Sequence, residues 1–252
     1  MSKRRHLPTL LIAATFAVIA ADSVPEPVWA FKLCEGEGSA INNSGSGAEA
    51  AKATLLAAEK TEWGAGRLGG SSLYFKNDVT GTTRGKYSGI IVANHGAVDF
   101  SASFSVCAWI LPDKTMIPGN CYQIFGDIAS DQGPGFRLLY GWKALRLTSG
   151  DGIKGVAISS TVYTPFPFGT WHHVAVTYNA TEKIARIYLN GALAAESQPG
   201  FVLEKSRHKH FSIACYGSGY ADGWVGAVSD VKVFDQTLTH KQILVEAQNL
   251  KN

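Results

Sequence analysis

The sequence predicts an all-β fold of two packed antiparallel sheets, with a short helix near the C-terminus. The clearest evidence lies in residues 171–178, where valine and tyrosine recur at every second position and the residues between them fall on the opposite face. A second alternating segment ends at Asn190-Gly191, two residues that tolerate the positive φ angles of a type I′ hairpin turn. These observations indicate a meander of strands rather than a helical fold.

The rest of the chain carries the same signals in order. Thr239 and Gln242 form a capping box ahead of a helix over residues 243–247. Strands are expected from alternation or from short apolar runs between turn signals, over residues 28–33, 72–75, 90–93, 104–111, 122–125, 136–140, 144–147, 156–163, 171–178, 184–189, 192–196, 211–214 and 225–234.

Short motifs carry a resemblance that extends along the chain. They are, in order, Trp29-Ala30-Phe31, the turn from Asn42 to Gly47, the segments 69–75, 104–110 and 168–197, Phe211-Ser212-Ile213 and the segment 224–234. In this order they resemble the laminin G-like domains of the concanavalin A-like lectin and glucanase group. The resemblance covers nearly all residues after about Val28 and implies a two-sheet jelly-roll sandwich.

Local propensity and the resemblance disagree at residues 48–60. Their alanine, glutamate, lysine and leucine content favours a helix. The corresponding region of the family is extended or irregular, and we expect the family's conformation here.

Residues 1–21 are expected to be a signal peptide, because a basic start at residues 3–6 precedes an apolar run over residues 10–21 that ends in small residues. The remaining residues 22–252 suit a single laminin G-like jelly-roll domain. The apolar run is short for a membrane span, so no stable span is expected after cleavage, although an uncleaved anchor is the alternative. We therefore expect a secreted, cell-surface or periplasmic protein.

The charge balance excludes one class of partner. The chain has 23 Lys and Arg against 20 Asp and Glu, and the excess of three is Lys3, Arg4 and Arg5, so the rest of the chain carries 20 against 20. Nucleic-acid binders need a basic face to displace counterions, and no nucleic acid partner is expected. The basic run at residues 207–210 is interpreted as a solvated loop.

Four cysteines, Cys34, Cys107, Cys121 and Cys215, are compatible with disulfides in an oxidising compartment. Three complete pairings are possible, and the sequence does not choose among them. In a jelly roll the segments of Cys34 and Cys215 would be neighbours, so the resemblance favours that pair. Buried free thiols are the alternative.

Catalysis has little support in the sequence. Glycoside hydrolysis needs two carboxyl groups that face the same bond. Only Glu35 and Glu37 have the spacing of the glucanase cluster, and Gly36 and Gly38 interrupt the strand that would align them. We expect a non-catalytic protein, with a glucanase-type glycoside hydrolase as the alternative.

The sequence offers two kinds of candidate metal site. The adjacent residues His172 and His173 would point to opposite faces of a strand and cannot chelate one ion together. The resemblance implies calcium held by oxygen ligands, for which Asp230 and Asn42 stand at suitable positions. Lys76 replaces an acidic residue of the family's pattern, which weakens the expectation of calcium.

Ligand binding is expected where aromatic residues lie among glycines. Tyr140, Trp142, Tyr216 and Tyr220, together with Asp222, meet this description. Sugar rings stack on such aromatic faces, while a carboxylate binds their hydroxyl groups; ordinary packing of the loops is the alternative. The sequence thus predicts an exported binding module for a carbohydrate or a cell-surface or matrix ligand, acting through rim loops. A purely protein-binding adhesion module is a further alternative.

Overall fold

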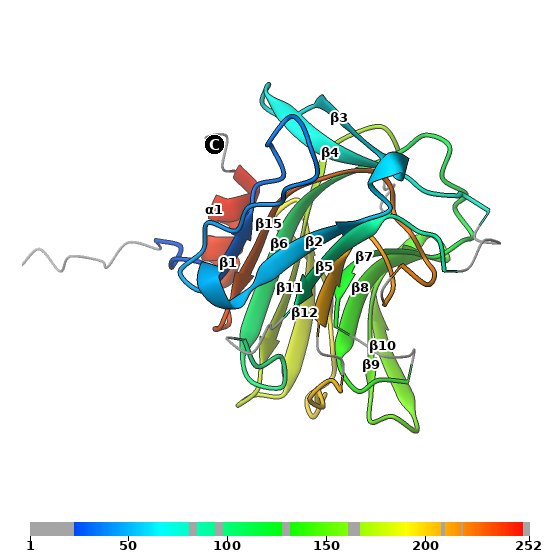
Figure 1. Cartoon of the computed structure of the whole chain (residues 1–252). Coiled ribbons are helices and arrows are strands. Elements are labelled where there is room, and N and C mark those ends of the chain that lie inside the picture. Colours follow the sequence, from blue (N-terminus) through cyan, green and yellow to red (C-terminus); the bar gives the residue numbers. More distant parts are fainter. Residues whose placement is uncertain are drawn as a thin grey trace, which may run out of the picture.

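The computed structural model describes most of the chain, namely residues 23–80, 85–93, 98–127, 132–160, 167–207, 210–217 and 219–248. These residues form two antiparallel sheets that pack face to face, with a short helix against one of them (Figure 1). The expected all-β sandwich is confirmed. The signal peptide expected at residues 1–21, the last three residues of the strand expected over 156–163, and His208 with Lys209 lie outside the described residues.

The eight-stranded sheet contains the meander that the sequence predicts most clearly. Its strand order is β13-β12-β11-β6-β15-β4-β3, and β1 also pairs with β15. The strands are β1 (Trp29–Phe31), β3 (Thr61–Ala65), β4 (Ser71–Lys76), β6 (Phe104–Pro112), β11 (His172–Asn179), β12 (Ile184–Leu189), β13 (Ala192–Glu196) and β15 (Val225–Phe234).

The seven-stranded sheet faces it, in the order β10-β9-β8-β7-β14-β5-β2. Its strands are β2 (Lys52–Leu56), β5 (Gly89–Ala93), β7 (Tyr122–Gly126), β8 (Phe136–Gly141), β9 (Ala144–Gly150), β10 (Gly155–Ser159) and β14 (His210–Ile213).

Residues 48–60 adopt the extended conformation implied by the resemblance, and the local helix propensity does not prevail. Strand β2 pairs with β5 from Lys52 opposite Ala93 to Leu56 opposite Gly89. Only two single-turn 3₁₀ helices, η1 (Ala48–Ala50) and η2 (Ala58–Lys60), flank it. Backbone pairing with β5 and contact of the β2 side chains with the core outweigh a weak intrinsic preference.

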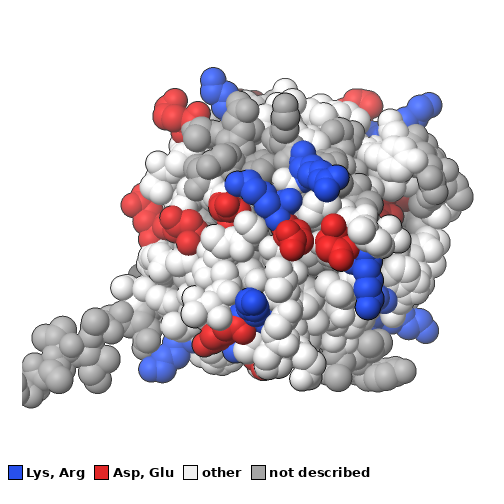
Figure 2. Space-filling model, turned by 90° about the horizontal axis from the view of Figure 1, so that it is seen from below, with Lys and Arg blue, Asp and Glu red and all other residues white. Residues whose placement is uncertain are grey.

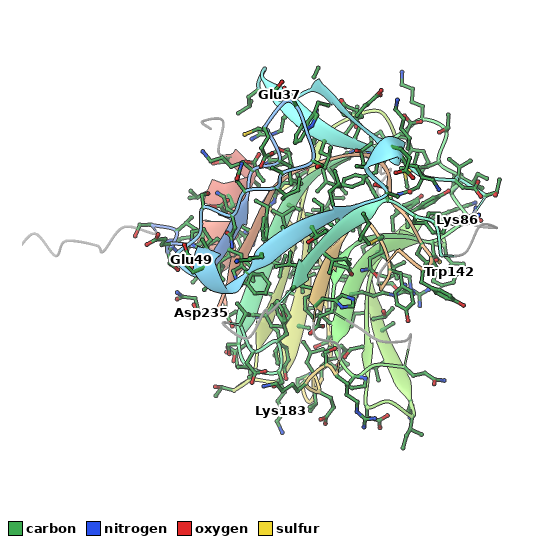
Figure 3. All side chains as sticks on the ribbon, in the orientation of Figure 1. Glu37, Glu49, Lys86, Trp142, Lys183 and Asp235 are labelled. Atoms are coloured by element: carbon green, nitrogen blue, oxygen red, sulfur yellow. The ribbon has the colours of Figure 1, made fainter. Side chains whose placement is uncertain are left out.

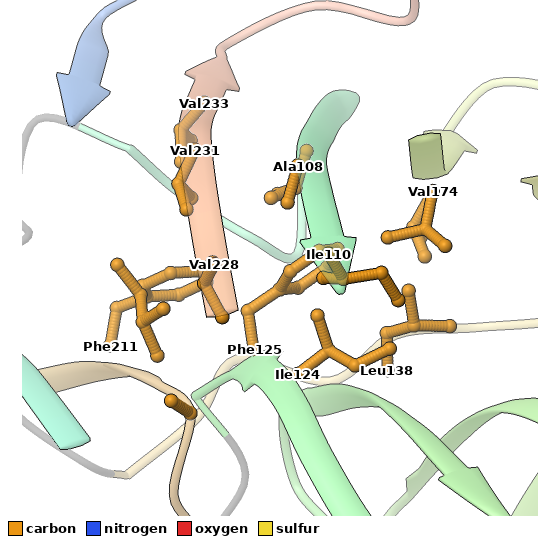
Figure 4. Packing of buried hydrophobic residues seen from close by; sticks show 14 of the residues in the cluster. Ala108, Ile110, Ile124, Phe125, Leu138, Val174, Phe211, Val228, Val231 and Val233 are labelled. Carbon is orange, nitrogen blue, oxygen red and sulfur yellow. The ribbon is translucent and has the colours of Figure 1, made fainter. Parts of the chain in front are cut away.

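Apolar side chains from both sheets interdigitate in one core (Figure 4). Phe100 stacks on Phe211 with ring centroids 5.4 Å apart, and Phe104 lies 4.7 Å from Phe136. The edge of Trp29 meets Phe100 at 5.9 Å. Such aromatic pairs contribute about 0.5–1.5 kcal/mol each beyond the area that they bury. Because inward positions alternate with outward ones, the same strands present polar side chains on their outer faces.

Helix α1 (His240–Gln248) covers part of the outer face of the eight-stranded sheet. Its capping box is formed: the backbone N–H of Thr239 donates to Gln242 Oε1 at 2.9 Å, and that of Gln242 donates to Thr239 Oγ1 at 3.3 Å. Ile243 joins a second apolar cluster with Tyr188 and Phe234. Among the described residues, no helix combines the length and apolar character required to cross a membrane.

The cysteine pair favoured by the resemblance is not formed, and of the four cysteines Cys107 and Cys215 are buried, as the alternative of buried thiols expects. Cys34 is exposed beyond β1, on the margin of the eight-stranded sheet. Cys215 follows β14 in the other sheet and is buried against Gly89, where an added Cβ would lie 2.2 Å from its Sγ. The two segments belong to different layers, so the assumed proximity was wrong.

The β12–β13 turn has the positive φ angles expected, 51° at Asn190 and 82° at Gly191. The Asn190 side chain also ties the turn to β11: its Oδ1 accepts a hydrogen bond from the backbone N–H of His173 at 2.9 Å, and its Nδ2 lies 3.2 Å from His172 Nδ1. The turn therefore depends on Asn190 in two separate ways, through its backbone and through its amide.

Replacing Asn190 separates these two contributions. Both N190A and N190G lose the side-chain hydrogen bonds, but only alanine retains the left-handed strain, which costs about 1–2 kcal/mol. We expect N190A to lower the free energy of unfolding by about 1 kcal/mol more than N190G, measured by urea denaturation. Equal losses in the two variants would contradict a contribution from the backbone conformation.

Candidate functional site

The candidate site lies on the outer face of the seven-stranded sheet. Along β8, Phe136, Leu138 and Tyr140 turn into the core, so Arg137 points outward. Along β9, Arg146 and Thr148 take the outward positions, and Thr148 pairs with Arg137 across the strands. Sequence alternation alone thus places two arginines on one face.

A hollow of about 260 Å³ opens on this face over β8, β9 and β10. Its lining combines one aromatic ring, two guanidinium groups, one hydroxyl and the backbone of an edge strand. The lining residues are Arg137, Trp142, Arg146, Thr148, Gly155, Val156 and Ala157. An aromatic wall together with a few convergent polar groups is a feature of small-molecule sites.

Arg137 fixes one side of this hollow. Its side chain is 3% exposed, and its Nη1 lies 2.6 Å from Asp222 Oδ2. Its Nε donates to Thr148 Oγ1 at 3.3 Å, and its guanidinium carbon lies 4.8 Å from the centroid of the Tyr216 ring. Asp222 and Tyr216 belong to the loop between β14 and β15, so a buried ion pair ties that loop to the sheet.

Trp142 forms the other side. It sits in the β8–β9 turn with φ of 49°, followed by Lys143 with φ of 66°. The residue is 55% exposed, and the guanidinium carbon of Arg146 lies 4.5 Å from the centroid of its ring. Figure 3 shows Trp142 at the periphery, on the side of the sandwich opposite helix α1. A bulky residue in the left-handed region is strained by about 1–2 kcal/mol, and such outliers often mark function.

The structure brings most of the expected ligand-binding residues together. Tyr216 and Asp222 lie at Arg137, and Trp142 lines the same hollow. Tyr220 is 49% exposed. Its backbone N–H donates to the Tyr216 carbonyl oxygen at 3.0 Å and closes the turn between these two residues. These residues come from the β8–β9 hairpin and the β14–β15 loop.

Tyr140 has surroundings that do not suit the ligand contact predicted for it. It is 4% exposed, and its ring meets Phe168 edge-on at 5.5 Å. As the last inward residue of β8, it faces the core although a glycine follows it. Arg137 and Arg146 were not predicted from the sequence. Each is a charged residue between two apolar residues of a strand that point into the core, and this pattern could have indicated an outward position.

Asp230 does not have the surroundings of a calcium ligand. It occupies a bulge of β15 with φ of 49°. Burial raises the pKa of its carboxyl group, opposed by a hydrogen bond from Ser229 Oγ and by the positive charges of Lys232, Arg67 and Lys32. Three cationic side chains around one carboxylate disfavour a divalent cation at the same place.

Asn42, the second expected ligand, is exposed in the loop that follows β1. Its backbone N–H donates to Glu35 Oε1 at 2.9 Å, and no contact joins it to Asp230 within the described residues. The described ranges also contain no group of three His, Cys, Asp or Glu side chains that could hold a metal. The residues named for calcium do not fit that ion, and we assign it no role at this site.

The two glutamates considered for catalysis do not form a strand pair. Residues 32–40 contain no strand, and Gly36 and Gly38 have φ of 84° and 71°. Glu37 projects from a loop far from Trp142 in Figure 3, and the hollow beside Trp142 has no carboxylate in its lining.

The histidine pair belongs to the framework. His173 is 1% exposed, and burial first, then the charges of Lys232 and Arg67, lower its pKa to about 3. Its ring contacts Trp109 at 5.4 Å. His172 Nε2 lies 3.0 Å from the Pro167 carbonyl oxygen. Burial lowers the pKa of His172, and the hydrogen bonds to Pro167 and Asn190 oppose this shift.

The surface seen in Figure 2 has acidic and basic side chains intermixed, without a continuous basic area. This distribution agrees with the near-equal numbers of acidic and basic residues in the sequence.

Comparisons with known proteins concern the family and the fold. The model of the concanavalin A-like lectin/glucanases superfamily matches residues 84–244, which is more than half of the 252-residue chain. Among curated proteins, none matches the sequence.

Several solved structures resemble this one. The binding domain of botulinum neurotoxin serotype D has 14% identity and a TM-score of 0.65, covering 88% of this chain and 51% of that one. The serotype D ligand-binding domain in complex with N-acetylneuraminic acid has 15% identity and a TM-score of 0.64, covering 88% and 50%.

A third similar structure is described by the words that cell entry of botulinum neurotoxin type C is dependent upon interaction with two ganglioside molecules. It has 14% identity and a TM-score of 0.64, covering 90% of this chain and 52% of that one. This chain therefore spans about half the length of these structures, and at such identities the likeness establishes the fold alone.

Removing Asp222 tests the structural core of the site. In D222A the Arg137 charge stays largely buried without its carboxylate, and we expect a loss of about 2 kcal/mol in the free energy of unfolding. E196A is the matched control, because Glu196 pairs with the more exposed Arg186 at 2.5 Å and such pairs contribute under about 1 kcal/mol. Chemical denaturation of both variants measures the difference, and a similar small loss in both would contradict the buried ion pair.

Proposed function

This chain belongs to the concanavalin A-like lectin/glucanases superfamily, and we propose that it is an exported, non-catalytic module that binds carbohydrate in the hollow beside Trp142. One observation carries the proposal: a tryptophan that is 55% exposed is held in a strained turn at the wall of a polar hollow. A turn with positive φ angles is formed at less cost by Gly or Asn, which supports a role for the indole other than forming the turn.

The chemistry of the hollow suits a sugar. The C–H face of a pyranose ring packs on the exposed part of the Trp142 indole, and the polar groups opposite orient its hydroxyl groups. Thr148 and Arg146 supply these groups from β9, and Arg137 supplies a guanidinium held in place by Asp222.

The solved structures support carbohydrate as the class of ligand. One of the similar domains is described in complex with N-acetylneuraminic acid, and another by its dependence on gangliosides. They share the fold at 14–15% identity, so the choice of ligand for this chain depends on its own residues.

Binding rather than hydrolysis is favoured by the residues at the hollow. A glycosidase places two carboxyl groups about 5–10 Å apart across the scissile bond. The lining has no carboxylate, and the nearby Asp222 is paired with Arg137. The proposed binding requires no calcium, since the hollow lacks the carboxylate ligands that such a site uses.

Export is part of the proposal, on the basis of the basic start at residues 3–6 and the apolar run over residues 10–21. A mature protein that begins near residue 22, found by N-terminal sequencing, would support export; retention of Met1 in the cytoplasm would oppose it.

The test is a glycan array probed with the chain lacking residues 1–21, in calcium and again with a chelator. We expect selective binding that the chelator leaves unchanged. W142A should weaken binding about tenfold or more, because truncating a central aromatic contact costs about 1.4 kcal/mol or more.

The matched control is L193A, which removes another exposed apolar side chain, on β13 of the other sheet. It should bind as the unmodified chain does. Binding that is lost equally in L193A, or retained fully in W142A, would place the ligand elsewhere. No binding to any glycan would overturn carbohydrate recognition and favour a protein partner.

A further inference from the structure

We propose that the ligand is an acidic saccharide, whose carboxylate or sulfate group pairs with Arg146 while its ring lies on Trp142. This inference rests on the proposed carbohydrate-binding function and names the class of sugar. It follows from the different states of the two arginines in the hollow.

Arg137 is already neutralised. Its Nη1 lies 2.6 Å from Asp222 Oδ2, and its side chain is 3% exposed. A ligand that offered it an anion would have to displace that carboxylate. Arg137 therefore shapes the hollow and holds the β14–β15 loop, and it does not supply a free charge.

Arg146 has no such partner among the described residues. No acidic side chain within the described ranges forms an ion pair with it, and its Nε is buried without a hydrogen-bond acceptor. Its guanidinium is held over the Trp142 ring at 4.5 Å. The lining residues of the hollow, taken with Asp222, thus carry one uncompensated positive charge.

The position of Arg146 in the sheet strengthens this difference in charge compensation between the two arginines. It lies opposite Leu139 on β8 and Ser159 on β10, so neither neighbour across the strands provides a counter-charge. The ring of Trp142 covers one side of the guanidinium and reduces its contact with water. A partly desolvated guanidinium with unused donors gains most from a bidentate anion.

Neutral sugars would be disfavoured at the same place. A neutral ring laid on Trp142 would exclude water from Arg146 without returning a charge, and a desolvated unpaired charge is costly. A carboxylate or sulfate beside the ring supplies the missing partner. The structure thus favours acidic over neutral glycans by a difference in electrostatic pairing. Contact with the Trp142 ring contributes to the binding of acidic and neutral glycans alike.

A glycan array of matched families tests this. Each neutral glycan is present also in a sialylated, a uronic-acid-containing and a sulfated form. We expect an acidic form to bind at least about tenfold more tightly than its neutral parent, because charge-assisted hydrogen bonds are the stronger class. Raising the salt concentration should reduce that advantage. The carboxylated and sulfated arms show which acid group fits.

The variant R146Q should bind acidic and neutral members alike. K183Q is the matched control: it removes one positive charge from the β11–β12 turn, which lies apart from Trp142 in Figure 3, and should retain the preference. R146K keeps the charge but not the planar fork, so it should retain part of the preference and remains informative if R146Q fails to fold.

The outcomes separate this inference from the function on which it rests. Tight binding of neutral glycans with no advantage for acidic ones would overturn the assignment to acidic sugars and leave carbohydrate binding standing. An acidic preference that persists in a folded R146Q would overturn the role of Arg146. Binding to no member of the array would overturn both.

Discussion

The strict alternation of strands β8 and β9 is the constraint on which the site depends. Each apolar residue that fills the core forces its neighbour to the outer face, and in this sheet two of those neighbours are Arg137 and Arg146. A one-residue shift in register would bury both charges in the aromatic core around Phe136 and Phe211, at a large cost. The same strand register therefore packs the core and places the polar side chains of the hollow on the outer face.

The positive charges of Arg137 and Arg146 have different surroundings. Asp222 reaches back from the β14–β15 loop to Arg137, and this pair closes one wall of the hollow. The guanidinium of Arg146 lies over the ring of Trp142, which belongs to the turn just before β9. The first arrangement stabilises a loop, and the second leaves a charged and aromatic surface that an acidic sugar would complement.

Much of the fold follows from local sequence, and the site follows less well. The meander, the Asn190 turn and the α1 cap were predicted because each depends on residues close together in the chain. The contact between Arg137 and Asp222 joins residues 85 positions apart, so it depends on the order of strands across the sheet. The same applies to the cysteines, since Cys34 and Cys215 lie in different layers. Tyr140 shows that neighbouring glycine does not indicate which face of a strand a ring takes.

The most direct test of the account is an NMR titration of the indole N–H signals with 3′-sialyllactose. The chain has six tryptophans, and the signal of Trp142 is assigned by its loss in W142F. The account predicts a saturable shift of the Trp142 signal, while those of Trp29 and Trp224, both buried in the core, stay in place. Saturable shifts at other tryptophans with an unchanged Trp142 signal would contradict binding at this face.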